Sequence, residues 1–257
     1  MSEDEAFVRA IVDRPGDDTA RLVYADWLDE RDDPRGPYLR AEAEWVRTGK
    51  KVRALRTLAK PLDAVWVARL SRPPVGVCCD HVKLRKSGPA VTPEDIDATE
   101  QRVGGTFGAQ FRAFLLNYNG GVPKPAHLAY PEAAGELWSD MDLEVGEFYR
   151  ITLRSETVPK KAGAWYRRIE HEREFLQDLF ENGGGEGPNP LIAHTVPFAD
   201  TPNDQGYLLI GTGSKNRGKV YHFRDYCHSS DDPEYLFDFF PTFTEFLAQL
   251  RPERDST

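Results

Sequence analysis

The residues with the clearest potential for phosphate chemistry are 213–220, which read GSKNRGKV. They match the G-x-x-x-x-G-K pattern of a phosphate-binding loop, but that pattern requires a Ser or Thr next, to ligate magnesium, and then a helix. Val220 has no hydroxyl, and the residues after it alternate as in a strand. We therefore interpret the glycines as part of a hairpin turn and expect no nucleotide or other cofactor.

Cysteine and histidine occur together at residues 78–81 (CCDH) and again at Cys227-His228. Thiolates and imidazoles are the ligands of structural zinc, so these two groups could form a metal site. Their spacing fits no standard paired-ligand pattern, which favours a buried thiol pair and surface histidines. The sequence therefore predicts no metal site.

Acid and base chemistry would have to come from scattered residues. Asp200 and Asp204 flank Thr-Pro-Asn, a composition typical of a turn that needs no catalytic explanation. His194 and His222 occupy alternating positions of predicted strands, where a structural histidine is the ordinary case. No motif identifies a nucleophile, so a hydrolase that uses Asp200, Asp204 or His222 is the least favoured hypothesis.

The most acidic stretch lies between Lys124 and Arg150, where no lysine or arginine occurs. Its predicted partner-binding residues are Glu132, Glu136, Trp138, Asp140, Asp142, Glu144 and Glu147. Phe148 and Tyr149 join Trp138 as large rings available to anchor an interface. Like charges this close repel one another, so a recognition surface for a basic partner would explain them; a solvated loop is the alternative.

Charge is unevenly distributed along the chain. Residues 1–72 hold 14 basic and 14 acidic residues, so the remainder of the 257 residues carries the whole formal net charge of −9. Such a surface repels nucleic acid and attracts basic proteins. The acidic N-terminus is unlike a secretory signal, no apolar run approaches the ~20 residues of a membrane helix, and three cysteines build no disulfide framework. We therefore expect a cytoplasmic protein without a membrane or nucleic-acid partner.

Residues 1–72 are predicted to form a small helical module. Ser2 and Glu5 make a capping box for a helix that ends at Asp13. Further helices are expected from Asp17 or Asp18 through Leu28, over 38–47, and over 52–70 with a bend at Pro61. Residues expected to face inward include Leu22, Val23, Leu39 and Val46. Residues 73–90 form a predicted linker, in which 75–84 could be a strand.

Residues 91–257 alternate between helical and strand patterns. Helices are predicted over 94–103, 107–116, 164–181 and 242–250; Asn119-Gly120-Gly121 stops the second of these helices. Strands are predicted over 191–198, 206–210 and 219–224. This order of elements indicates an α+β domain with a mainly antiparallel sheet flanked by helices.

Two segments resemble known families. Residues 2–47 contain RLVYADWLDER and DPRG and resemble a short bacterial repeat-companion domain, which has no established activity. Residues 91–251 resemble the SUKH superfamily of SMI/KNR type, which includes yeast cell-wall synthesis regulators and many bacterial immunity proteins. The matching stretches are 94–103, 107–121, 196–200, 218–221 and 243–247; the sequence departs from the family pattern over 123–154 and 183–190.

The SUKH resemblance implies an α+β fold that binds and neutralises protein toxins, often nucleases, without catalytic residues of its own. The predicted function is therefore a non-enzymatic immunity protein that covers a basic, nuclease-like toxin with an acidic surface. The alternative is a cytoplasmic signalling or scaffold adaptor whose N-terminal module directs the second domain to a cellular complex.

Overall fold

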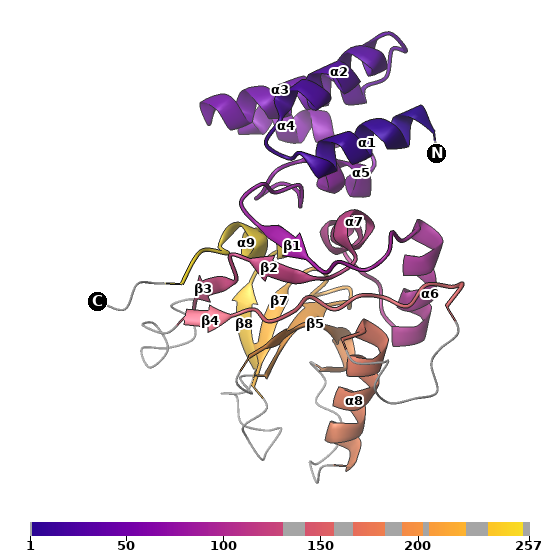
Figure 1. Cartoon of the computed structure of the whole chain (residues 1–257), viewed down its shortest axis with the longest axis vertical. Helices are drawn as coiled ribbons and strands as arrows, with labels where there is room; N and C mark the ends of the chain where they lie inside the picture. The colour runs from indigo at the N-terminus through magenta and orange to yellow at the C-terminus, as the bar shows by residue number, and fades with distance from the viewer. Residues whose placement is uncertain are drawn as a thin grey trace. The chain divides into compact units, whose positions relative to one another are not determined.

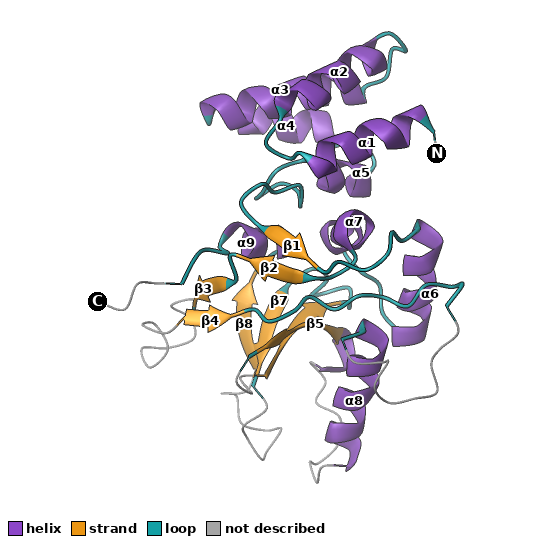
Figure 2. Cartoon of the chain, viewed as in Figure 1, coloured by secondary structure: helices purple, strands orange, loops and turns teal. Residues whose placement is uncertain are grey.

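The computed structural model describes residues 2–130, 142–156, 167–182, 192–202, 206–224 and 236–253. The chain divides into two compact units, Met1–His81 (unit 1) and Val82–Thr257 (unit 2). Unit 1 is helical, whereas unit 2 combines helices with antiparallel strands (Figures 1 and 2). The predicted α+β fold class is confirmed. Every helix in the described ranges is too short or too polar to cross a membrane.

Polar caps explain where three helices of unit 1 begin. Ser2, Asp17 and Asp63 each accept a hydrogen bond from a backbone N–H of the first helical turn. Because Asp63 starts a new helix, the single bent helix predicted over 52–70 is instead two helices. The described helices are α1 (Glu3–Asp13), α2 (Asp18–Asp29), α3 (Arg35–Thr48), α4 (Val52–Ala59) and α5 (Ala64–Leu70).

The core of unit 1 surrounds a buried arginine. The Arg21 guanidinium donates from Nη1 to Pro15 O at 2.6 Å and from Nη2 to Leu70 O at 3.1 Å. Its Nη2 also lies 3.3 Å from Cys78 Sγ, and its Nε lies 3.5 Å from Glu42 Oε2. One side chain thus ties α2 to α3, to the end of α5 and to two loops.

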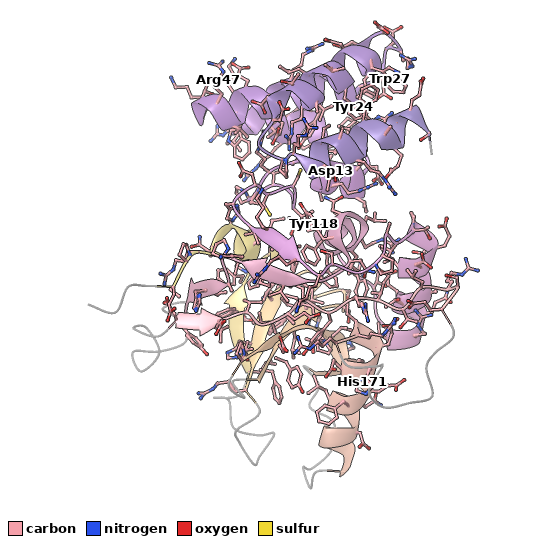
Figure 3. All side chains as sticks on the ribbon, viewed as in Figure 1. Asp13, Tyr24, Trp27, Arg47, Tyr118 and His171 are labelled. Carbon is pink, nitrogen blue, oxygen red and sulfur yellow. The ribbon has the colours of Figure 1, made fainter. Side chains whose placement is uncertain are left out.

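Leu22, Val23 and Val46 do not belong to this core, so their predicted inward orientation is wrong. Their exposed fractions are 40%, 49% and 42%. The buried stripe of α2 consists of Arg21, Tyr24, Ala25 and Leu28 (Tyr24 is labelled in Figure 3). Spacings of three and four put that stripe on one helix face, which leaves Leu22 and Val23 on the opposite face.

The segment that follows α5 folds back on unit 1. Val77 N donates to Ala68 O at 2.8 Å, and Cys78 N donates to Ser71 O at 3.0 Å. Within the predicted strand over 75–84, only the end belongs to a strand, β1 (Lys83–Arg85). Val77 and Cys78 instead donate their backbone hydrogen bonds to the end of α5 and are not in a sheet.

Unit 2 contains the remaining elements, labelled in Figure 1. Its helices are α6 (Pro93–Val103), α7 (Ala109–Tyr118), α8 (Ile169–Asn182) and α9 (Phe243–Ala248). Its strands after β1 are β2 (Val122–Lys124), β3 (His127–Ala129), β4 (Asp142–Glu144), β5 (Thr195–Thr201), β6 (Gly206–Gly211), β7 (Val220–Phe223) and β8 (Leu236–Phe240). Thr92 and Asp95 form the capping box of α6.

Two boundaries and one strand in unit 2 differ from the predictions. Residues 192–194 form a 3-10 helix, so the strand predicted from residue 191 begins only at Thr195. The helix predicted over 164–181 begins at Ile169, and residues 164–166 lie outside the described ranges. Strand β8 had no counterpart in the sequence analysis.

The central sheet is antiparallel, in the order β5-β6-β7-β8. Residues 146–149 extend it beyond β5, because Tyr149 N donates to Phe198 O at 2.7 Å and Asp200 N donates to Glu147 O at 3.2 Å. On the other side of this segment, Phe148 exchanges two hydrogen bonds of 2.9 Å with Gly121, just before β2. The two-stranded sheets β1-β2 and β3-β4 complete the described strands.

Aromatic rings form the core on one face of the central sheet. α7, α9, β5 and residue 148 supply rings with centroids 5.0–6.2 Å apart: Phe111, Phe114, Phe148, Phe198, Phe243 and Phe246. On the opposite face, Leu176 of α8 packs with Leu209, Tyr221 and Phe223. Both faces are therefore covered by helices (Figure 2).

Candidate functional site

The described part of the predicted partner-binding set begins in β4. This strand pairs with β3 in a register that puts Leu143 opposite Leu128, and both leucines are fully buried. Because side chains alternate along a strand, Asp142 and Glu144 point away from these leucines. Both acidic residues are half-buried.

Asp142 and Glu144 differ in their partners. Arg251 Nη2 donates to Asp142 Oδ1 at 2.6 Å, and the Arg251 backbone exchanges hydrogen bonds of 3.0 and 2.8 Å with His127 of β3. The Asp142 carboxylate thus holds the C-terminal segment against β3. Glu144 forms no ion pair with a described residue, so its charge is the one more available to a partner.

Glu147 belongs to a second acidic position, beside β5. Its backbone N–H donates to Asp200 Oδ1 at 2.5 Å, and its carboxylate accepts a hydrogen bond from Arg167. Arg167 Nη2 also lies 3.9 Å from Asp200 Oδ2, so one arginine connects two carboxylates. Burial raises the pKa of Asp200, while the Glu147 N–H and the Arg167 charge oppose that rise. Arg167 has a φ of 71°, which is uncommon for a residue other than glycine.

Phe148 and Tyr149 are not interface anchors, which corrects the sequence analysis. Their exposed fractions are 1% and 2%, and Phe148 lies 5.0 Å from Phe114 in the aromatic core. Burial also raises the pKa of the Tyr149 phenol. The strand-like segment 146–149 turns these rings inward, so neither contributes to a surface.

Four predicted partner-binding residues lie outside the described ranges: Glu132, Glu136, Trp138 and Asp140. The three that are described occupy two positions, β4 and the neighbourhood of Asp200. Arginines 167 and 251, which bind two of them, were missed by the sequence analysis. The signal that could have pointed to them is the excess of carboxylates itself, since half-buried carboxylates need a cation or hydrogen-bond donor.

The residues of the phosphate-loop pattern form the predicted hairpin between β6 and β7. Gly211 N donates to Lys219 O, and Gly218 N donates to Gly211 O, both at 2.9 Å. Gly213 N donates to Asn216 Oδ1 at 2.9 Å. The backbone N–H groups that would hold a phosphate are thus engaged in closing the turn, and the hairpin interpretation is confirmed.

The cysteine and acid–base candidates are likewise explained by packing. Cys78 is fully buried, and burial raises the pKa of its thiol to about 11, which disfavours the thiolate form that binds metal. Cys227, His228 and Asp204 lie outside the described residues.

Asp200 and His222 do not converge. Asp200 pairs across the sheet with Tyr207, whereas His222 pairs with Leu208 of the same strand. Adjacent positions of a strand face opposite sides of a sheet. His222 is fully buried, with its Nδ1 3.2 Å from the Tyr130 hydroxyl. The hydrolase hypothesis therefore gains no support from the placement of these two side chains.

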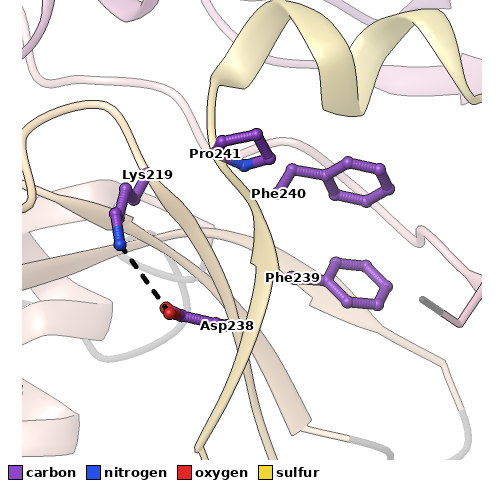
Figure 4. Close-up of a pocket in the computed structure, with 5 residues that line it drawn as sticks. All are labelled: Lys219, Asp238, Phe239, Phe240 and Pro241. Atoms are coloured by element: carbon purple, nitrogen blue, oxygen red, sulfur yellow. Dashed lines mark ion pairs between the residues drawn. The ribbon is translucent and has the colours of Figure 1, made fainter. Parts of the chain in front are cut away.

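A pocket of about 160 Å³ lies at the end of β8 (Figure 4). It is lined by Lys219, Asp238, Phe239, Phe240 and Pro241, and the Lys219–Asp238 ion pair spans 3.7 Å. Small-molecule sites usually enclose roughly 300–1,000 Å³. This pocket is too small for such a ligand.

The architecture of unit 2 agrees with one comparison with known proteins. The family model of the SMI1 / KNR4 family (SUKH-1) matches residues 90–249, which is more than half of the chain. The chain belongs to this family. The SUKH family is associated with immunity, in which its members bind protein toxins, and it is generally non-catalytic. No curated protein and no solved structure matches the chain.

The SUKH match includes the helix stop at Asn119-Gly120-Gly121, and the structure explains these residues. Asn119 has a left-handed φ of 44° and accepts a hydrogen bond from Ile151 N at its Oδ1. A Cβ on Gly120 would lie 2.7 Å from Phe148 O, and one on Gly121 would lie 2.8 Å from Arg85 O. The glycines are needed because the chain passes between β1 and the segment that extends the central sheet.

Proposed function

We propose that this SUKH domain is an immunity protein that binds a basic, nuclease-like toxin and covers its active cleft. The family match carries the proposal, and the charge distribution supports a basic partner, because the residues after 72 hold the entire net charge of −9. Complementary charge raises association rates and excludes acidic competitors such as nucleic acid. The domain acts by occlusion in the cytoplasm and performs no catalysis of its own.

The acidic set from Glu132 to Glu147 is the proposed contact surface. Among its described members, Glu144 supports the proposal best, because its half-buried carboxylate has no ion-pair partner in the described ranges. Asp142 and Glu147 are held by Arg251 and Arg167, which fixes their positions before a partner arrives. Preorganised side chains reduce the conformational entropy lost on binding.

The test is co-expression with the C-terminal domain of the protein encoded in the neighbouring reading frame. The unaltered chain is expected to restore growth of a host that produces this domain. The purified proteins are expected to bind with a dissociation constant that rises with salt, because exposed charges are screened beyond ~8–10 Å. Failure to protect, or affinity that is indifferent to salt, contradicts the proposal.

A charge reversal locates the surface. Glu144→Lys is expected to weaken binding about tenfold or more, which corresponds to about 1.4 kcal/mol. The matched control is Glu30→Lys, which changes the net charge equally at an exposed residue of unit 1, outside the proposed contact surface. Equal effects of the two substitutions would show that only net charge matters and that β4 is not part of the contact.

A second candidate is an adaptor, and one observation favours it. Unit 1 exposes Leu22, Val23 and Val46, three large apolar side chains on two adjoining helices, and exposed apolar surface often marks a docking site. We propose that residues 2–47 form the repeat-companion domain that their sequence resembles. If the chain is only an immunity protein, removal of residues 1–81 should leave protection intact. If it is an adaptor, the shortened chain should no longer be found at the cellular complex to which the full chain is directed.

A further inference from the structure

Helix α8 presents an aromatic side chain to solvent on its outer face. Phe175 is 45% exposed. Among the described residues of unit 2, it is the only large apolar side chain that is exposed. The adjoining face of the helix is fixed, because Ile169 and Leu176 are buried and Leu176 packs on Leu209 of β6. The outward orientation of Phe175 is therefore set by packing on the sheet.

Two exposed acidic residues border Phe175 on its solvent side. His171, Glu174, Phe175 and Asp178 follow the i, i+3, i+4, i+7 spacing of one helical stripe, and His171 is labelled on α8 in Figure 3. Glu174 and Asp178 are exposed, whereas His171 is half-buried beside Glu172. An apolar ring bordered on one side by carboxylates is suited to a basic surface that also offers an apolar depression.

The only lysine or arginine of α8 is directed away from this stripe. Arg173 lies on the buried side of the helix, its Nη2 is 3.5 Å from Ala193 O, and burial lowers the pKa of its guanidinium. Arg173 therefore does not offset the exposed carboxylate of Glu174, which forms no ion pair with a described residue. The start of α8 is also tied to the proposed contact surface, because Arg167 pairs with Glu147 and its N–H donates to Glu172 Oε1 at 3.2 Å.

We propose that the stripe His171–Glu174–Phe175–Asp178 is a second contact of the same basic partner, with Phe175 as its apolar anchor. This inference rests on the proposed function. The stripe would add a specific apolar contact to a surface that is otherwise recognised through charge. Interfaces concentrate their affinity in a few large side chains surrounded by polar residues.

The experiment measures binding of the full chain to the C-terminal domain encoded in the neighbouring reading frame. Phe175→Ala is expected to weaken binding at least about 30-fold, the level of an interface hot spot. Its thermal unfolding should match that of the unaltered chain, because an exposed ring contributes little to the core. Glu174→Lys is the second variant, with an expected loss of about tenfold, and Glu30→Lys in unit 1 is its charge-matched control.

The outcomes separate this inference from the proposed function. If the unaltered chain binds in a salt-dependent way but both α8 variants change the dissociation constant by less than about threefold, the stripe is not a contact and the proposed function stands. If the unaltered chain does not bind, both ideas are wrong. If Phe175→Ala shifts the unfolding temperature, Glu174→Lys compared with Glu30→Lys decides the result.

Discussion

Asn119 offers the sharpest test of how the SUKH helix stop stabilises unit 2. Its exposed fraction is 1%, and its amide bridges two segments distant in sequence. Oδ1 accepts from Ile151 N at 3.0 Å, and Nδ2 donates to Pro89 O at 2.9 Å. Its carbonyl oxygen also accepts from Gly88 N at 3.0 Å. We predict that Asn119→Ala is strongly destabilising although it removes few apolar contacts.

The magnitude follows from three contributions. Loss of the amide leaves the buried Ile151 N–H unsatisfied, at a cost of about 1–3 kcal/mol, and removes the partly exposed bond to Pro89, worth about 0.5–1.5 kcal/mol. Alanine in the left-handed region costs about 1–2 kcal/mol more. The expected total is about 4 kcal/mol. For a unit of this size it lowers the melting temperature by about 10 °C.

Asn119→Gly is the matched control, because it removes the same hydrogen bonds without the left-handed penalty. It should be more stable than Asn119→Ala by about 1 kcal/mol. Urea denaturation followed by circular dichroism gives the free energies, and hydrogen exchange read by mass spectrometry assigns them to unit 2. Our reasoning is wrong if Asn119→Ala lies within about 1 kcal/mol of the unaltered chain. It is wrong about the backbone if the alanine and glycine variants are equal.

Three further predictions concern buried and half-buried charge. Arg21→Met should destabilise unit 1 by about 3–5 kcal/mol, because a buried carboxylate and two carbonyls lose a donor; hydrogen exchange should locate the loss in unit 1 alone. Gly36→Ala should cost about 1–3 kcal/mol in urea denaturation, because its Cβ would overlap the Asp29 carboxylate. Burial raises the pKa of Asp200, so its contribution to stability falls as pH rises above the unfolded value of about 3.9; a hydrogen bond from Arg168 lowers the pKa of Glu156, so its contribution is lost as pH falls below about 4.3. Relative to the unaltered chain, Asp200→Asn should therefore gain stability as pH rises through the acid range, and Glu156→Gln should lose it; parallel pH profiles of unfolding for both variants would contradict these signs.

Local signals in the sequence were sufficient for much of the fold. Ser2 and Thr242 were expected at helix starts, and each accepts a hydrogen bond from the first turn of its helix. Asn119 with its glycines ends α7 as predicted. These features depend on residues three or four positions apart, so a single sequence records them.

Features set by distant contacts were not predictable in the same way. Strand β8 exists because it pairs with β7, and its Phe239 occupies an irregularity between the paired residues Asp238 and Phe240. Leu22 and Val23 have apolar side chains, so a helical pattern assigns them to the core. In the structure Arg21 is buried instead, and Leu22 and Val23 are exposed. An arginine is expected at the surface, and the burial of Arg21 depends mainly on partners distant in sequence, namely Glu42, Leu70 and Cys78.

In the candidate surface, too, contacts between residues distant in sequence were not predictable, and here they affect the proposed function. The run without lysine or arginine between 124 and 150 suggests a uniform negative field, yet Arg251 and Arg167 come from 109 and 20 residues away to bind Asp142 and Glu147. These pairs lower the charge available to a partner and also hold the carboxylates in place, so the surface loses long-range attraction and gains preorganisation. Recognition by such a surface depends on where the unpaired charges remain. In the described residues these include Glu144 on β4 and Glu174 on α8, which is why charge reversal at either position, compared with the equal change at Glu30 of unit 1, tests the mechanism more directly than any change in net charge.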